Sequence, residues 1–124
     1  MTDAANRATR RAAVTEYAGE RHVVITRYLA GAPADVWAEL AEPDGLALWC
    51  GADVAAGLTV EVSDPPVRFE GRTGAGRLWF ELVPDEDVTV LTAGRVLAPG
   101  DDAPAIARAW DLLLDAFIAA RPPR

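Results

Sequence analysis

The chain has few of the side chains that carry out catalysis. Its 124 residues include one histidine, one cysteine and one serine, and there is no lysine or glutamine. A Ser-His-Asp triad would need Ser63 and His22, but Ser63 directly precedes a Pro-Pro turn. Metal sites need clustered His, Cys or carboxylate ligands, and the sequence has no ligand-like spacing. We therefore predict no catalytic residue, no metal site and no cofactor.

A single cysteine, Cys50, excludes an internal disulfide and favours a reducing compartment, the cytoplasm. Cys50 follows Trp49 in an apolar stretch, which favours a small buried residue over a nucleophile paired with His22. Arg10-Arg11 has no apolar segment behind it, so an export signal is not expected. No apolar run approaches the length of a membrane span.

The charge balance argues against two classes of partner. The net charge is −7, and all twelve basic residues are arginine. Nucleic-acid backbones and anionic membranes favour cationic surfaces, so neither is an expected partner. The length fits one domain, and we predict a polar tail over residues 1–13 followed by a single domain over 14–124.

Two short helices in tandem are predicted over residues 32–51. Pro33 suits a first helical position, and Pro43 repeats the pattern. Each predicted helix places one tryptophan inward, Trp37 in the first and Trp49 in the second, and Gly51 ends the pair. This segment is a helical elbow between two groups of predicted strands.

The rest of the chain before residue 96 has the alternation typical of strands. The segment from His22 to Leu29 is rich in β-branched and aromatic residues. Turn residues then separate short alternating runs, which indicates an antiparallel meander. The predicted strands cover residues 14–17, 22–29, 52–56 (a brief edge strand), 58–63, 67–72, 77–83 and 88–95.

A long amphipathic helix follows a loop over residues 96–102. Asp101 and Asp102 precede Pro104 and place negative charge at a helix start. An apolar stripe of helical period faces inward, with Arg108, Asp111 and Asp115 expected to face water. The stripe consists of Ile106, Trp110, Leu113, Leu114, Phe117 and Ile118. The predicted fold class is α+β, with a curved antiparallel sheet gripping this helix around an apolar cavity.

Several short motifs occur in a fixed order. They are Arg27, Ala32-Pro33, Val36-Trp37, Glu42-Pro43 through Leu46 to Trp49, Val60 to Pro66, Leu78 to Pro84 and Ala109 to Leu114. Their order resembles the START-related helix-grip (SRPBCC) superfamily, in the branch named for the activator of the ninety-kilodalton heat-shock protein ATPase. Only about ten residues join Trp49 to Val60, where the family has a longer run with a strand pair. The resemblance implies a sheet one hairpin short and a smaller or more open cavity.

Two charged residues in predicted strands, Arg27 and Glu81, each have two possible roles. Arg27 lies among apolar strand residues and would either face outward in a salt bridge or bind an anionic group in the cavity. Glu81 has the same ambiguity with opposite charge. The candidate cavity residues are Arg27, Trp49, Phe69, Trp79, Glu81, Trp110, Leu114 and Phe117.

The leading functional hypothesis is binding of a small hydrophobic or amphipathic ligand between the sheet and the last helix. The resemblance also implies a cyclase, aromatase or hydrolase alternative, with Glu81 or Tyr28 moving a proton. A third alternative is a chaperone cofactor acting through protein contacts. An exposed sheet edge makes a homodimer a further expectation.

Overall fold

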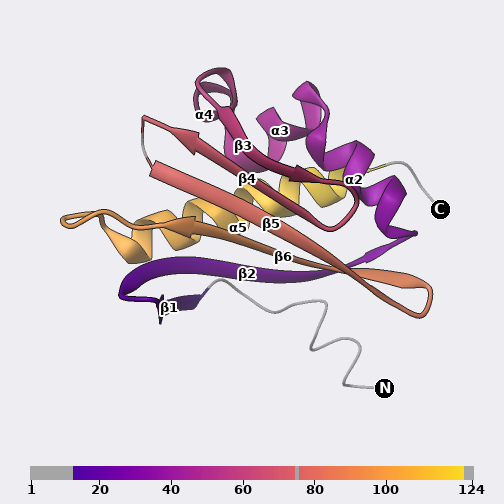
Figure 1. Ribbon diagram of the computed structural model, residues 1–124, viewed down its shortest axis with the longest axis horizontal. Helices are drawn as coiled ribbons and strands as arrows, with labels where there is room; N and C mark the ends of the chain where they lie inside the picture. The colour runs from indigo at the N-terminus through magenta and orange to yellow at the C-terminus, as the bar shows by residue number, and fades with distance from the viewer. Residues whose placement is uncertain (1–12, 75, 122–124) are drawn as a thin grey trace.

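A computed structural model describes residues 13–74 and 76–121 of the chain. Within them, six antiparallel strands form one sheet in the order β1-β2-β6-β5-β4-β3, and the helices lie together beside it (Figure 1). The elements are β1 (Ala13–Tyr17), β2 (Glu20–Ala30), α2 (Pro33–Ala41), α3 (Pro43–Cys50), α4 (Ala52–Ala56), β3 (Thr59–Asp64), β4 (Arg68–Thr73), β5 (Gly76–Asp85), β6 (Val88–Val96) and α5 (Ala103–Ala120). The predicted α+β class is confirmed. Residues 1–12 of the predicted tail lie outside the described residues, and Ala13 already belongs to β1.

Strand β2 shows how the sheet separates its two faces. Val23, Ile25 and Leu29 are buried on the face that carries the helices. The alternate residues, such as Val24 and Thr26, point to the opposite face, which we call the outer face. The apolar alternation in the sequence therefore marks which side of the sheet faces the helices.

The helical elbow forms as predicted from α2 and α3. Trp49 is fully buried, and its indole N–H donates to the carbonyl oxygen of Leu40 over 3.1 Å, which ties α3 to the end of α2. Gly45 permits this contact, since a Cβ there would lie 1.7 Å from the carbonyl oxygen of Glu39. Any larger residue at position 45 would separate the two helices.

The predicted edge strand over residues 52–56 is wrong, because this segment is helix α4. Three of its five residues are alanine, the strongest helix former, and the hydrophobic alternation is too short to override that preference. Gly51, with φ of 95°, separates α4 from α3, and Gly57 caps its end. The short connection between elbow and β3 is therefore helical.

Helix α5 closes the helix side of the sheet. The carboxylate of Asp102 accepts from the N–H of Ala105 over 3.1 Å and caps the helix start. Trp110, Leu114 and Phe117 are buried on the face that meets the rest of the protein. The predicted apolar stripe is thus confirmed at its centre.

Aromatic rings fill the space between the sheet and the helices. The ring of Phe80 lies with its centroid 5.6 Å from Trp49 and 5.1 Å from Phe69. Trp49 in turn meets Trp110 edge to face at 5.8 Å, and Trp37 packs against Phe80. A hollow of about 10 Å³ beside Trp110 has room for at most one water molecule.

Candidate functional site

The structure does not bring the eight candidate cavity residues together. Six of them lie on the helix side of the sheet, where they are buried: Arg27, Trp49, Phe69, Trp110, Leu114 and Phe117. Trp79 and Glu81 lie on the outer face, because they alternate along β5 with the buried Leu78 and Phe80. The hollow that the sequence analysis placed between sheet and helix is occupied by packed side chains, and a larger hollow lies on the outer face.

Arg27 is an internal ion-pair partner of helix α5. Its side chain is 3% exposed, and its Nη2 lies 2.6 Å from Asp111 Oδ1 and 3.4 Å from Asp115 Oδ1. Of the two alternatives for Arg27, the salt bridge is present, but the side chain points inward rather than outward. The expectation that Asp111 faces water is wrong, since its side chain is 17% exposed and contacts Arg27. The need to neutralise a buried guanidinium explains this orientation.

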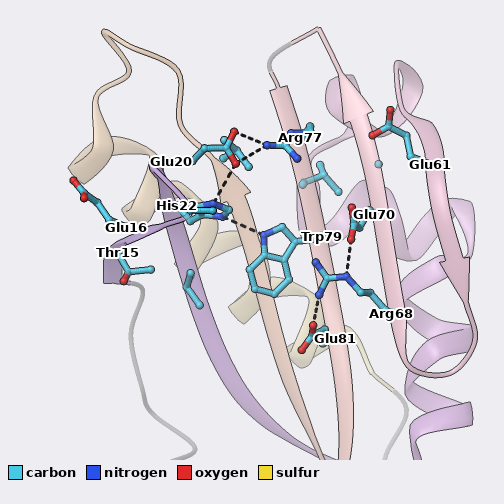
Figure 2. A pocket seen from close by; sticks show the side chains of 15 residues that line it. Thr15, Glu16, Glu20, His22, Glu61, Arg68, Glu70, Arg77, Trp79 and Glu81 are labelled. Carbon is cyan, nitrogen blue, oxygen red and sulfur yellow. Dashed lines mark hydrogen bonds and ion pairs between the residues drawn. The ribbon is translucent and has the colours of Figure 1, made fainter.

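A pocket of about 700 Å³ lies on the outer face of the sheet (Figure 2). Residues from all six strands surround it, and the hairpin between β1 and β2 contributes Ala18. The lining residues are Thr15, Glu16, Ala18, Glu20, His22, Val24, Glu61, Arg68, Glu70, Gly71, Arg77, Leu78, Trp79, Glu81 and Val96. This volume suits a small organic molecule.

The indole of Trp79 lies at the centre of this pocket. Trp79 and Gly94 are direct partners across β5 and β6, and Gly94 is also paired with Val24 of β2. The indole lies across Gly94, since a Cβ at that position would be 2.2 Å from the ring. The guanidinium carbon of Arg68 is 5.1 Å from the ring centroid, a cation–π contact. The missing side chain at position 94 therefore fixes where the indole lies.

Arg68 is held by carboxylates on two neighbouring strands. Its Nε donates to Glu70 Oε2 over 2.6 Å, and its Nη1 donates to Glu81 Oε1. Burial lowers the pKa of the Arg68 guanidinium, but hydrogen bonds and charge from Glu70 and Glu81 outweigh it and raise the pKa above its ordinary value. Arg68 is thus a fixed cation on the indole.

A second polar group occupies the other side of Trp79. The indole N–H donates to Nδ1 of His22 over 3.3 Å, so this nitrogen carries no proton and Nε2 carries it. His22 Nε2 lies 3.8 Å from Glu20 Oε1, and both oxygens of Glu20 accept from Arg77 Nη2 at 2.5 and 2.6 Å (Figure 2). His22 is buried, with 8% of its surface exposed.

Arg68, Arg77 and His22 were not predicted from the sequence as members of one site. The signal was present as charged residues on alternate positions of adjacent strands, Arg68 with Glu70 and Arg77 with Glu81. Alternation alone does not show which face of a strand is hollow, because hollowing depends on sheet twist and on the register of neighbouring strands.

Cys50 is a structural thiol. It is buried, and its Sγ–H donates to the carbonyl oxygen of Leu46 over 2.9 Å. Burial raises the pKa of the Cys50 thiol to about 11, so the thiolate is scarce at neutral pH. The prediction of a small buried residue at this position is confirmed.

Two further features concern residues 13–74 and 76–121. No group of three or more His, Cys, Asp or Glu in these ranges is placed to hold a metal ion. None of the helices in the described ranges combines the length and apolar character needed to cross a membrane.

Comparison with known proteins gives a fold. No family model and no curated protein matches the chain. Among solved structures it is similar to CalU16 from Micromonospora echinospora, with 14% identity and a TM-score of 0.65 over 88% of this chain and 80% of that one. A conserved protein of unknown function, EF2215 from Enterococcus faecalis, has 12% identity and a TM-score of 0.66, covering 98% of this chain and 86% of that one. The Aha1 dimer from Colwellia psychrerythraea has 17% identity and a TM-score of 0.64, covering 80% and 94%.

These neighbours are helix-grip proteins of the SRPBCC and AHSA1-like type. The chain therefore has the helix-grip fold, as the resemblance in its motifs implied. At this level of identity the likeness establishes the fold and leaves function to the residues of the site.

Proposed function

We propose that this protein binds a small amphipathic molecule in the outer-face pocket. The observation that carries the proposal is a hollow of about 700 Å³ in which Trp79 and Val24 supply apolar surface among charged side chains. Mixed lining of this kind gives a ligand both contact area and directional hydrogen bonds. The structural neighbours belong to a family that commonly binds ligands, which is consistent with this role.

The packing on the helix side supports placing the ligand on the outer face. Trp49 and Phe80 are fully buried and in mutual contact, so a ligand between sheet and helix would have to displace aromatic side chains. Displacing packed rings costs several kcal/mol (~3–5 by analogy with their removal). The outer-face pocket needs no such rearrangement.

Native mass spectrometry tests whether the protein carries a ligand. The protein is purified from its own host and measured before and after denaturation. The proposal predicts a mass increment that is lost on denaturation and is absent from a Trp79→Ala variant, while a Trp37→Phe variant retains it. Absence of any increment, together with no binding from a panel of small aromatic and aliphatic molecules, would contradict the proposal. Chemical change of an added ligand would instead support the enzyme alternative.

We also propose self-association through strand β3, one of the two edge strands of the sheet. All six residues of Thr59–Asp64 are exposed, and Val60 is 52% exposed. An exposed apolar edge strand favours pairing with a second copy of the same strand. Light scattering after size exclusion would give a dimer for the wild type and a monomer for a Val60→Pro variant. A monomer in both would contradict this proposal.

A further inference from the structure

The outer-face pocket has an excess of negative charge. Its lining includes five glutamates and two arginines, and Nδ1 of His22 accepts the hydrogen bond from Trp79. A hollow with walls of one charge attracts ligands of the opposite charge. Negative charge alone does not identify the ligand, but the contacts that the lining side chains already make indicate its chemical class.

The pocket already binds one organic cation, the side chain of Arg68. Its guanidinium lies over Trp79 and is held by carboxylates of Glu70 and Glu81. An indole with flanking carboxylates is an arrangement suited to ammonium and guanidinium groups. The contacts of Arg68 therefore indicate that the pocket lining suits an organic cation.

The carboxylates retain capacity for a second cation. In Glu61, Glu70 and Glu81 an arginine contacts one carboxylate oxygen, and the other oxygen has no hydrogen bond within the described residues. Glu16 of β1 lies at the rim of the same hollow (Figure 2). A carboxylate has about four lone-pair sites, so one arginine contact does not saturate it.

An anionic ligand meets the opposite situation. Arg68 faces two carboxylates, and Arg77 faces both oxygens of Glu20. An anion would have to approach these glutamates or displace them from the arginines, at the expense of charge-assisted hydrogen bonds. A cation could contact the unused carboxylate oxygens without displacing a glutamate from its arginine.

From these contacts we infer that the ligand is an organic cation, an ammonium or guanidinium group attached to an apolar body. The charged group would be held by the unused oxygens of Glu61, Glu70 and Glu81, with Glu16 completing the charge at the pocket rim. The apolar body would lie against Val24 and Val96, beside Trp79. The inference rests on the proposed function and specifies its ligand class.

Three probes of the same shape and different charge test the inference by isothermal titration calorimetry. They are 2-(1-naphthyl)ethylamine, 2-(1-naphthyl)ethanol and 1-naphthylacetate, titrated into the full-length protein at pH 7. We expect the amine to bind roughly tenfold tighter than the alcohol and the carboxylate to bind weakest. Binding of the amine should weaken as sodium chloride is raised, because the carboxylates are partly exposed.

The outcomes separate the two proposals. Equal binding of all three probes, or preference for the carboxylate, would overturn the cation inference and leave ligand binding intact. Binding of none of them, nor of any of the cationic, neutral or anionic molecules in the wider panel, would overturn both.

Charge-neutral variants identify the carboxylates involved. A Glu16→Gln, Glu81→Gln double variant should lose roughly five- to tenfold in affinity for the amine and change little for the alcohol. Glu86→Gln, an exposed residue in the turn between β5 and β6, is the matched control and should leave both affinities unchanged. Equal loss for amine and alcohol would indicate a damaged pocket rather than lost charge, and would contradict the inference. Should the double variant fold poorly, the salt dependence of the wild type gives the same decision.

Discussion

The indole of Trp79 lies across Gly94, its direct partner on the neighbouring strand, so closely that a Cβ on Gly94 would be 2.2 Å from the ring. This contact places the indole flat on the outer face of the sheet. From there its N–H reaches His22 and its ring meets Arg68. A glycine without a side chain therefore organises the polar groups on both sides of the pocket.

Gly94→Ala should disrupt the pocket. The new methyl group would displace the indole and break its hydrogen bond to His22. We expect a loss of roughly 1–3 kcal/mol in the free energy of unfolding and a much larger effect on the pocket, with amine binding reduced at least tenfold. Tryptophan fluorescence and calorimetry would measure the two effects.

Gly57→Ala is the matched control for that substitution. The nearest atom to a Cβ at Gly57 is 3.9 Å away, and φ there is −100°, which alanine adopts without strain. This variant should bind like the wild type. Wild-type affinity and unchanged fluorescence in Gly94→Ala would contradict the arrangement described for Trp79.

The ion pair between Arg27 and Asp111 should be a strong structural link between sheet and helix. Arg27→Met would leave the Asp111 carboxylate partly buried without its cation, and we expect a loss of about 2–4 kcal/mol in unfolding free energy. Adding Asp111→Leu should recover most of that loss, because the double variant buries no charge. Urea denaturation of the two single variants and the double variant measures the coupling.

An exposed pair serves as the control for this cycle. Arg72 and Glu61 form an ion pair with Nε–Oε2 of 3.0 Å and both side chains exposed. Arg72→Met should cost no more than about 1 kcal/mol. Equal effects of Arg72→Met and Arg27→Met would show that burial adds nothing to the Arg27 pair.

Alkaline pH should destabilise the protein through Cys50. Burial raises the pKa of the folded thiol to about 11 from an ordinary value of 9.0. The unfolded chain therefore loses the thiol proton first, and the stability held below pH 9 falls as pH rises toward 11. The integrated loss is on the order of 2–3 kcal/mol.

The comparison with Cys50→Ala isolates this effect. The chain has no lysine, so few other groups titrate in this range. The alanine variant is expected to be less stable at pH 7 but to show a flatter profile between pH 9 and 11. Parallel profiles for the two proteins in chemical denaturation would contradict the assignment of a buried, protonated thiol.

Local signals in the sequence predicted most of the fold. Pro33 and Pro43 predicted the starts of the two elbow helices. The alternation of apolar residues predicted strand β2, and the apolar stripe through Trp110 and Leu114 predicted helix α5. The segment Ala52–Ala56 was assigned to a strand because five residues carry too little periodicity to separate helix from strand. The helix propensity of its three alanines explains why this segment is a helix.

The site was predicted only in part, for a different reason. Trp79 and Glu81 were identified as candidates, but on the wrong side of the sheet. Their grouping with His22 and Arg68 depends on the register of β2, β4, β5 and β6, which joins residues far apart in the chain. Arg27 was recognised as unusual, yet its partners lie on a helix 84 residues away.

Nuclear magnetic resonance of the tryptophan indoles shows on which face of the sheet the ligand binds. The protein is labelled with ¹⁵N-tryptophan, and the four indole N–H signals are followed during titration with 2-(1-naphthyl)ethylamine. Trp37→Phe, Trp79→Phe and Trp110→Phe variants assign three of the four signals, and the remaining signal belongs to Trp49. We expect the Trp79 signal to move while those of Trp49 and Trp110, buried on the helix side, stay in place. Movement of the Trp49 and Trp110 signals with a stationary Trp79 would place the ligand between sheet and helix and contradict the proposed outer-face site.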